Sequence, residues 1–552
     1  MPVPTARPRV TIVMTPRERF TLTERAIDAV RASTAVPFRF IFAFADLPDW
    51  LAPRLRQRAD KGEIELRQVR DAAWPNQIRM AIAADLDTDY VVFLDNDVVP
   101  EPGWLEALLA CADETGAGIV APLYLWSDGT GPSGRIHMAG GRLTWIEGPD
   151  GSSLREEHAH MNEEAEELGS ALSRRPCDFG EYHCLMIRGD LVRSGIVFHE
   201  RINALHEHIH ASLAARERGL ATWLEPAARV TYLAFAPYTL RDLAYYSHRW
   251  SADGGEESIA AFAERWGVQD DEISFGGVRR FLARHREDVT LLRADAPAGQ
   301  LARTMRPEDL AQSRARLLDQ AAEAGYPPAA IAGLGRACLA AASLLDGAYR
   351  ACGRPFLNHL VGTASVLLFY RLRIQTVLGG LFHATFTHAP TMTTDPQSQL
   401  ALVTQALGGP EKTLSRLVHS YATRRHRWKA LPAGPKALED LSLLDAEVLV
   451  IAAANEAEMW LSGELRHAPA GREMTRPVET LAKEALATIG LPGLSLLLTQ
   501  IAATPPAPAP AGTAIGAPAA FMFRSGALVP VPNPLALVTK ASLSHPTRSA
   551  AR

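Results

Sequence analysis

Strand-like and helix-like segments alternate through the first 240 residues, and this alternation restricts the fold more than any other feature of the sequence. Short apolar or β-branched runs indicate strands at 10–14, 38–44, 64–69, 90–94 and 185–188. Apolar residues with helical spacing lie between them, at 21–30 and 78–84. The run from Val91 to Leu94 is apolar without interruption, as expected of a parallel strand covered on both faces. The pattern predicts a doubly wound α/β sheet.

The first helix of this region carries a start signal. Thr21 is followed three residues later by Glu24, the spacing of a capping box in which each side chain bonds the other residue's backbone N–H. Ala26, Ile27 and Val30 then lie on one face. We therefore expect Thr21 to cap this helix.

Two carboxylates follow the strand at 90–94 directly. Asp95 and Asp97 stand at positions i and i+2 after Leu94. Ligands of such sheets bind beyond the carboxyl ends of the strands. One or two carboxylates together with phosphate oxygens are the usual ligands of Mg²⁺ or Mn²⁺. The spacing therefore suits a metal and its bound diphosphate, and it suits a solvated loop with an Asx turn equally well.

Length and composition indicate more than one domain and exclude several classes of protein. A chain of 552 residues is too long for one ordinary core. The formal net charge of −5 gives no bias toward nucleic acid or anionic membranes. Five cysteines without metal-knuckle spacing fit reduced thiols. Because the start lacks an apolar signal core and no apolar run spans a bilayer, we expect a cytoplasmic protein with no transmembrane segment.

The composition changes twice along the chain. Residues 1–295 form the α/β domain, with a helical extension from about residue 240. From residue 296 to 503 the pattern is helical almost throughout, which predicts an all-α domain. Residues 504–552 are rich in Pro and Ala and contain no acidic residue. That composition is typical of a disordered tail.

The segment around the two carboxylates closely resembles the metal-binding segment of family 2 glycosyltransferases of the GT-A fold. It runs from Phe93 to Leu105, with the sequence FLDNDVVPEPGWL. Residues 11–19 resemble the first strand and loop of that family, 74–79 the segment near the sugar nucleotide, and 207–230 the acceptor-side block. The resemblance covers about residues 8–240. It implies a GT-A domain with a Rossmann-like mixed sheet.

The resemblance also implies ligands and roles for single residues. The donor would be a UDP-, GDP- or dTDP-sugar, the acceptor a glycan or another hydroxyl, and the cofactor Mn²⁺ or Mg²⁺ held by Asp95 and Asp97. No nucleic acid partner is expected. The residues implied in donor binding are Thr15, Arg17, Asp46, Asn76 and Arg79, with Asp49 as the alternative to Asp46.

The acceptor-side block departs from the family pattern. The family has Glu-Asp-x-Asp where this chain has Glu207, His208 and then His210. The histidine that often completes the metal shell after the last strand is replaced by Tyr232. Glu207 is our first candidate for the catalytic base and His208 the second, while His210 is our candidate for the third metal ligand. The alternative is a histidine-rich helix start that binds nothing.

Two further polar residues resemble the acceptor-facing strand of the family. Glu181 and His183 alternate onto one face of an extended segment, so both could point into the cleft and bind substrate. A satisfied polar pair at a sheet edge is the alternative. His137 stands before a glycine pair, and a lone histidine of this kind is more often structural.

The helical domain resembles, more weakly, an HD-domain phosphohydrolase, in residues 350–359 and 381–383. The metal-binding His-Asp pair of that family is His383-Ala384 here. His359 stands in the first of these segments. Thr387-His388 replaces the Glu-Asp expected a few residues after the pair, and Asn455 occupies the place of a distant Asp. We therefore expect a degenerate HD-like domain used for binding, regulation or homodimer contact. The alternative is that the three histidines gather Zn²⁺ or Fe.

Together these features predict a metal-dependent, inverting glycosyltransferase of the hexosyltransferase type with an accessory HD-like domain. One alternative is a catalytically inactive binding or regulatory protein. The other is a bifunctional transferase and phosphohydrolase.

Overall fold

The chain folds into two compact units, residues 1–289 and 290–552. The computed structural model describes residues 8–127, 134–149, 151–236, 238–289, 291–293, 296–350, 352–388, 414, 417–418, 420–422, 441–467, 476–503, 520–524 and 527–530. The boundary between the units lies close to residue 296, where the sequence pattern changes to helical. None of the described helices is long and apolar enough to cross a membrane.

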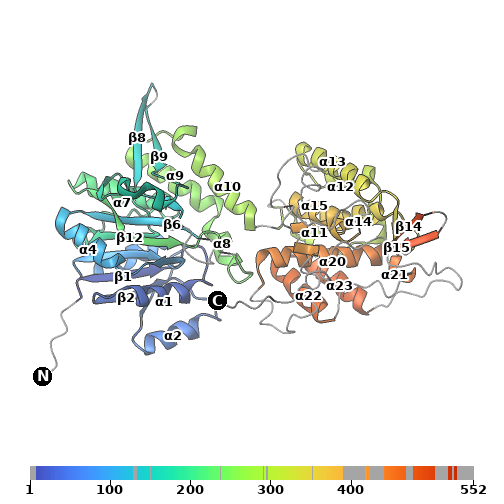
Figure 1. Ribbon diagram of the computed structural model, residues 1–552, viewed down its shortest axis with the longest axis horizontal. Helices are drawn as coiled ribbons and strands as arrows, with labels where there is room; N and C mark the ends of the chain where they lie inside the picture. The colour runs from blue at the N-terminus through green and yellow to red at the C-terminus, as the bar shows by residue number, and fades with distance from the viewer. Residues whose placement is uncertain are drawn as a thin grey trace, which may run out of the picture. The chain divides into compact units, whose positions relative to one another are not determined.

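The first unit is built on a ten-stranded mixed sheet (Figure 1). Its strand order is β10-β12-β6-β11-β4-β1-β2-β3, while β5 pairs with β12 and β7 with β6. The strands are β1 Val10–Thr15, β2 Phe38–Phe44, β3 Glu65–Gln68, β4 Tyr90–Asp95, β5 Val98–Pro100, β6 Ile119–Trp126, β7 Ile136–Met138, β10 Arg175–Cys177, β11 Cys184–Arg188 and β12 Thr222–Tyr232. Neighbours from β4 to β3 are parallel, whereas β11 is antiparallel to β4 and to β6. The predicted mixed α/β sheet is confirmed.

Helices and one hairpin complete this unit. Figure 1 shows α7 and α1 on opposite sides of the sheet, and the hairpin of β8 and β9 projecting from the body. The hairpin strands are β8 Gly141–Gly148 and β9 Gly151–His158. The helices are α1 Thr23–Ser33, α2 Ala52–Asp60, α3 Pro75–Ile82, α4 Trp104–Thr115, α5 Ala165–Leu168, α6 Gly189–Arg193, α7 Glu207–Glu217, α8 Leu243–Arg249, α9 Ala252–Trp266 and α10 Gly277–Val289.

The two central parallel strands bring polar residues to one edge of the sheet. All residues of β1 are buried, as are the apolar residues of β4, because helices and loops cover both faces. Their parallel register places Thr15 beside Asp95. On the other side of β4, the backbone N–H of Asp95 donates to the carbonyl oxygen of His183 at 3.1 Å. The ends of β1 and β4 and the start of β11 therefore meet at one edge of the sheet, and they bring Thr15, Asp95 and His183 together.

The predicted capping box is wrong. Helix α1 begins at Thr23, and the Thr21 hydroxyl donates instead to the Asp242 carboxylate at 2.7 Å. Glu24 pairs with Arg54 at 2.5 Å. Asp242 is fully buried and also accepts from the backbone N–H groups of Phe20 and Thr21. A buried carboxylate is a stronger acceptor than any neutral group at this helix start, so Thr21 acts as a donor.

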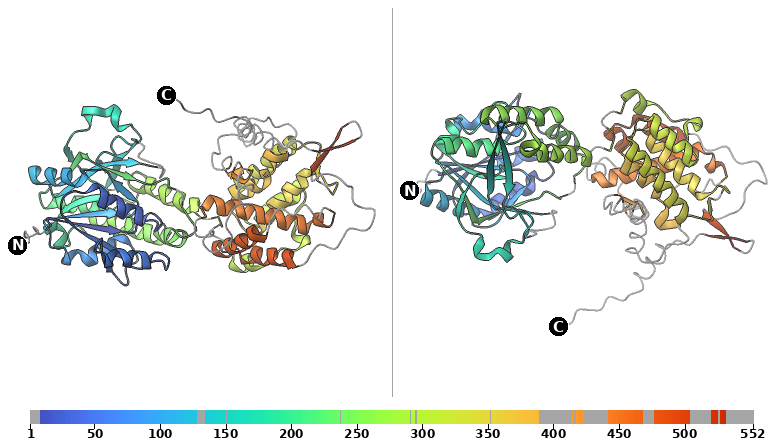
Figure 2. Two further views of the ribbon diagram at one scale, coloured as in Figure 1. Left: turned by 60° about the horizontal axis from the view of Figure 1, so that its bottom comes forward. Right: turned by 90° about the horizontal axis from the view of Figure 1, so that it is seen from above.

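The second unit is mainly helical (Figure 2). Nearly all residues of α14 and α20 are buried, which makes these two helices its core. Its described helices are α11 Ala298–Ala302, α12 Arg314–Glu323, α13 Pro328–Leu344, α14 Phe356–Phe369, α15 Ile374–Phe382, α16 Thr385–His388, α20 Leu443–Leu461, α21 Glu464–His467, α22 Arg476–Ile489 and α23 Pro492–Ala503.

A small antiparallel sheet joins the end of the chain to this unit. Strands β14 (Ala520–Arg524) and β15 (Ala527–Pro530) pair with each other, and β14 pairs with β13 (Ala348–Arg350). Both late strands fall within 504–552, where the sequence pattern predicts a disordered tail. Their mainly apolar sequences flank a Ser-Gly pair, a composition that permits a hairpin despite the surrounding prolines. The rest of that tail lies outside the described residues.

Asn96 ties the end of β4 to the loop that follows β1. Its side chain is fully buried, and its Nδ2 donates to the carbonyl oxygen of Arg19 at 2.6 Å and to Thr23 Oγ1 at 2.8 Å. Its Oδ1 accepts from the backbone N–H of Arg17 at 3.0 Å. This one amide fixes the backbone that carries the charged side chains of residues 17–19.

We predict that Asn96→Ala destabilises the first unit by about 2–4 kcal/mol, because it leaves buried backbone groups without partners. The measurement is the thermal unfolding midpoint of the full chain. The control Gln57→Ala removes an exposed amide from α2 and should change stability by less than about 0.5 kcal/mol. Equal midpoints for the two variants would contradict the role of Asn96.

Candidate functional site

The two carboxylates after β4 differ in whether neighbouring side chains bond to them. Both are fully buried. Asp95 Oδ1 accepts from Arg79 Nη2 at 2.9 Å, and its Oδ2 lies 3.4 Å from Arg17 Nε. Among the described residues, neither oxygen of Asp97 has a hydrogen-bond partner. Burial, with the charges of Glu18 and Asp95, raises the pKa of Asp97 to about 7. A buried carboxylate without a hydrogen-bond partner beside a second carboxylate fits a divalent cation.

Two buried arginines have donor groups that are not used. Arg79 donates to Thr15 Oγ1 at 3.2 Å and lies 4.2 Å from the centre of the Tyr182 ring, yet its Nε and Nη1 have no partner in the described part of the chain. The same is true of Nε and Nη1 of Arg249 at the end of α8. Burial lowers the pKa of Arg249, while Glu207 opposes this effect. Unpaired guanidinium donors are suited to phosphate oxygens.

Glu18 supplies the negative charge that balances the arginines of the same loop. Its carboxylate accepts from the hydroxyls of Tyr232 at 3.2 Å and Tyr238 at 2.6 Å. Burial alone would raise the pKa of Glu18, but the positive charges around it, Arg17 first, outweigh burial and hold the pKa at about 2. Tyr232 therefore bonds Glu18, and its hydroxyl is engaged at the position where the family often has a histidine.

An imidazole nevertheless lies beside Tyr232. The ring centroids of His183 and Tyr232 are 3.9 Å apart, and His183 Nδ1 lies 3.3 Å from Asp95 Oδ2. Asp95, Asp97 and His183 offer ligand atoms within 4.8 Å of one another. His183, and not His210, is therefore the histidine beside the two carboxylates. The sequence pattern alone did not place it there, because its position depends on the antiparallel pairing of β11 with β4.

His210 lies on α7, among aromatic side chains. Its ring centroid is 5.6 Å from that of Trp266 and 5.5 Å from that of His199. It is not part of the group formed by Asp95, Asp97 and His183. Residues 207 and 210 are three apart and so share a face of α7, but the His210 ring packs against Trp266 and His199 and not beside the two carboxylates.

The residues predicted to bind the donor are only partly brought together. Thr15, Arg17 and Arg79 surround Asp95. Asn76 is buried, and its Nδ2 donates to the carbonyl oxygen of Ile202 at 2.9 Å, so it holds a loop. Asp46 is exposed in the turn after β2, where it accepts from the backbone N–H of Leu47.

The two base candidates begin helix α7. Glu207 is its first residue and is 8% exposed, and its charge affects the pKa values of Tyr182 and Arg249. His208 is half-buried, its ring centroid lies 5.6 Å from that of Phe179, and burial lowers its pKa. Glu207 interacts electrostatically with Tyr182, and the ring of Tyr182 also contacts Arg79.

A row of histidine and glutamate side chains continues from His183. Glu181 Oε2 lies 2.6 Å from His137 Nε2 and 3.4 Å from His183 Nε2. His158 Nε2 lies 3.0 Å from Glu156 Oε1. Burial, then Arg17, lowers the pKa of His183 to about 4, whereas Glu181 and Glu156 outweigh burial and raise the pKa of His158 to about 9. The sequence analysis singled out three members of this row and missed His158 and Glu156, which lie in the hairpin strand β9.

A separate buried group lies in the second unit. His359, Glu458 and Glu464 offer ligand atoms within 4.8 Å of one another. His359 Nδ1 lies 2.5 Å from Glu458 Oε2. Arg354 Nη2 lies 2.8 Å from Glu458 and 3.1 Å from Glu464, and Arg350 Nη2 lies 2.6 Å from Glu464. Each carboxylate of this group therefore has an arginine partner.

The predicted HD-like positions contribute only one residue to that group. His383 has its ring centroid 5.2 Å from that of His359, and the His388 ring centroid is 5.2 Å from that of Phe356. Asn455 is buried on α20, one turn before Glu458. The helical repeat of three to four residues places both on one face, a signal by which Glu458 could have been found.

Comparison with known proteins supports the resemblance in part of the first unit. Residues 18–166 match the family model Glycosyl transferase family 2. No curated protein matches the chain. Among similar solved structures is the crystal structure of GalNAc-T7 with UDP, GalNAc and Mn²⁺, at 13% sequence identity and a TM-score of 0.34. That match covers 51% of this chain and only 55% of that chain. The segment that matches the family 2 glycosyltransferase model includes Asp95 and Asp97 and ends before Glu181 and Glu207.

Proposed function

We propose that the first unit transfers a sugar from a nucleotide-sugar donor to a hydroxyl acceptor. The observation that carries the proposal is Asp97, a fully buried carboxylate with no partner among the described residues, within the segment that matches the glycosyltransferase family. A buried polar group without a hydrogen-bond partner costs free energy unless a bound ligand supplies that partner. The donor nucleotide is UDP, GDP or dTDP.

Asp95 and Asp97 hold Mn²⁺ or Mg²⁺ in this proposal, and the bound ion supplies charge neutralisation for the departing nucleoside diphosphate. The protein's own contribution is a set of arginine donors around the same carboxylates. Nε and Nη1 of Arg79 and of Arg249 lack partners in the described structure, so they are free to bind phosphate oxygens. Arg17, which touches Asp95, adds a third positive charge. The cation and the arginines together supply positive charge that balances the negative charge of the diphosphate.

Glu207 takes the proton from the acceptor hydroxyl as that oxygen attacks the anomeric carbon. A single displacement of this kind inverts the configuration. A base must lie within reach of the acceptor and remain able to accept a proton at neutral pH. The placement of Glu207 at the start of α7, near Tyr182 and Arg249, supports the first condition. His208, the neighbouring residue, is the alternative base.

We predict that Asp97→Asn lowers nucleotide release about 10²–10³-fold, the size of effect expected when one electrostatic stabiliser of a transition state is lost. The measurement is nucleotide release from a panel of UDP-, GDP- and dTDP-sugars with Mn²⁺. The control Asp113→Asn removes an exposed carboxylate that pairs with Arg9, and it should retain full activity.

Two results would contradict this proposal. Unchanged turnover in Asp97→Asn would show that Asp97 does not hold a metal ion needed for the reaction. A wild-type chain that binds nucleotide sugars yet releases no nucleotide with any acceptor would support the binding-protein alternative instead.

We predict that Glu207→Gln lowers kcat about 10²–10⁴-fold while donor affinity changes little, because the amide keeps the shape but cannot accept the proton. His208→Ala, assayed in parallel, should have a smaller effect. Glu217→Gln at the other end of α7 is the matched control, since Glu217 is exposed and pairs with Arg265. A larger loss in His208→Ala than in Glu207→Gln would transfer the role of base to His208.

We infer that the second unit is an accessory, HD-like unit without hydrolytic activity. Hydrolysis of this type needs a bound metal, and carboxylates that are already neutralised by arginines attract a cation less strongly. Glu458 and Glu464 are each paired with arginine, so the group with His359 carries no excess negative charge from these side chains. The geometry supports a structural ion network in the core of this unit.

We predict that His359→Ala leaves the metal content of the full-length protein unchanged. The measurement is elemental analysis of the purified chain after dialysis against Mn²⁺ or Zn²⁺. Because His359 is buried, the folded fraction is checked by circular dichroism. Loss of one equivalent of metal in this variant would overturn the inference.

A further inference from the structure

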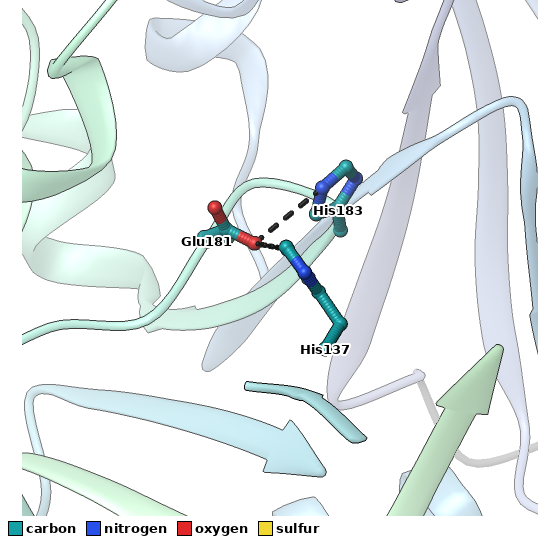
Figure 3. A group of neighbouring side chains, drawn as sticks. All are labelled: His137, Glu181 and His183. Carbon is teal, nitrogen blue, oxygen red and sulfur yellow. Dashed lines mark hydrogen bonds and ion pairs between the residues drawn. The ribbon is translucent and has the colours of Figure 1, made fainter. Parts of the chain in front are cut away.

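A second group of ligand-type side chains lies directly beside Asp95 and Asp97. Its members are His137 from β7, and Glu181 and His183 from the segment between β10 and β11. Their ligand atoms lie within 4.8 Å of one another. Figure 3 shows both imidazole rings directed at the same oxygen of the Glu181 carboxylate. The geometry points to a second metal site, and we propose that these three residues bind a borderline transition-metal ion, with Zn²⁺ as the first candidate.

The ligand atoms of the three side chains are already gathered at one point. His137 Nε2 and His183 Nε2 lie 2.6 Å and 3.4 Å from Glu181 Oε2. The side chains of His137, Glu181 and His183 are 7%, 13% and 3% exposed, so the group is shielded from competing water. Two imidazoles and one carboxylate are a ligand set that binds Zn²⁺ and leaves a fourth position open.

The segment that carries Glu181 and His183 is held in place by Tyr124 of β6. The buried Tyr124 hydroxyl donates to the carbonyl oxygens of Glu181 and Cys184, at 2.9 Å and 2.8 Å, and accepts from the backbone N–H of Glu181. A Cβ atom at Gly180 would lie 2.5 Å from Cβ of Ala121, so only glycine permits this close approach to β6. A fixed backbone keeps the ligands near their binding positions, which lowers the cost of ordering them.

The second nitrogen of His183 has the partner that a metal-binding histidine usually has. Its Nε2 faces Glu181, while its Nδ1 lies 3.3 Å from Asp95 Oδ2. Metal-ligating histidines commonly donate their other ring N–H to a carboxylate, which fixes the tautomer and the ring orientation. The Asp95 carboxylate can therefore orient His183 for an ion bound at Nε2.

Arg17 and His158 also border the group. Arg17 Nη1 lies 3.1 Å from both ring nitrogens of His183, and its positive charge opposes a cation there. That charge is offset, since Arg17 also lies 3.4 Å from Glu18 and 3.4 Å from Asp95. His158 Nε2 lies 3.7 Å from Glu181 Oε1 and supplies another nitrogen close to the group.

The experiment counts metal ions on the full-length protein and does not use sugar transfer. The chain is stripped with a chelator, dialysed against Zn²⁺ and analysed for zinc per chain, and Co²⁺ substitution provides a visible absorption band. We expect one Zn²⁺ per wild-type chain in the absence of nucleotide. His137→Ala should weaken Zn²⁺ binding at least tenfold and abolish the Co²⁺ band.

Three further variants make the result interpretable. Glu181→Gln keeps the shape of the side chain and should also weaken binding, which covers the case that His137→Ala does not fold. Asp97→Asn should retain the zinc, so failure of this site is distinguishable from failure of the donor-metal site. His160→Asn removes an imidazole outside the group and should bind zinc as the wild type does. A wild-type chain without stoichiometric zinc, or unchanged binding in both His137→Ala and Glu181→Gln, would overturn the proposal.

Discussion

The buried amide of Asn96 is the interaction on which the arrangement of charges in the first unit depends. It joins the end of β4 to the backbone of Arg17 and Arg19 and to the first residue of α1. The residues on either side of Asn96 are the carboxylates, and the residue between the two arginines is Glu18. One uncharged side chain thus brings oppositely charged groups of two chain segments together in a buried region, where their interactions are strong.

Those charges are balanced at some positions and unbalanced at others. Asp95 has arginine partners, but Asp97 has none among the described residues, while Arg79 and Arg249 keep donors that are not used. Excess negative charge at one carboxylate suits a cation, and unused guanidinium donors suit an anion. A metal ion together with a diphosphate satisfies both, so neither ligand alone completes the site. The transfer from a nucleotide sugar that we propose would meet this double requirement.

The central strands could be predicted from sequence because burial on both faces leaves an uninterrupted apolar run. The ranges 10–14, 38–44 and 90–94 agree closely with β1, β2 and β4. What could not be predicted depends on partners that are distant in sequence. Thr21 bonds Asp242 rather than its own helix, and the pairing of β11 with β4 brings His183, the residue before β11, beside Asp95. The family model likewise ends at residue 166, so the positions of Glu181, His183 and Glu207 come from the structure alone.

His183 connects the two proposed metal sites physically. Its two nitrogens face two different carboxylates, Asp95 and Glu181, and Arg17 lies equally close to both nitrogens. An anionic donor that engages Arg17 would reduce the positive charge at His183 and so strengthen a cation at Nε2. Because such coupling is reciprocal, an ion bound by His137, Glu181 and His183 must then tighten donor binding by the same factor. The histidine that was expected only to touch substrate would in this way make the donor site sensitive to the occupancy of the second metal site.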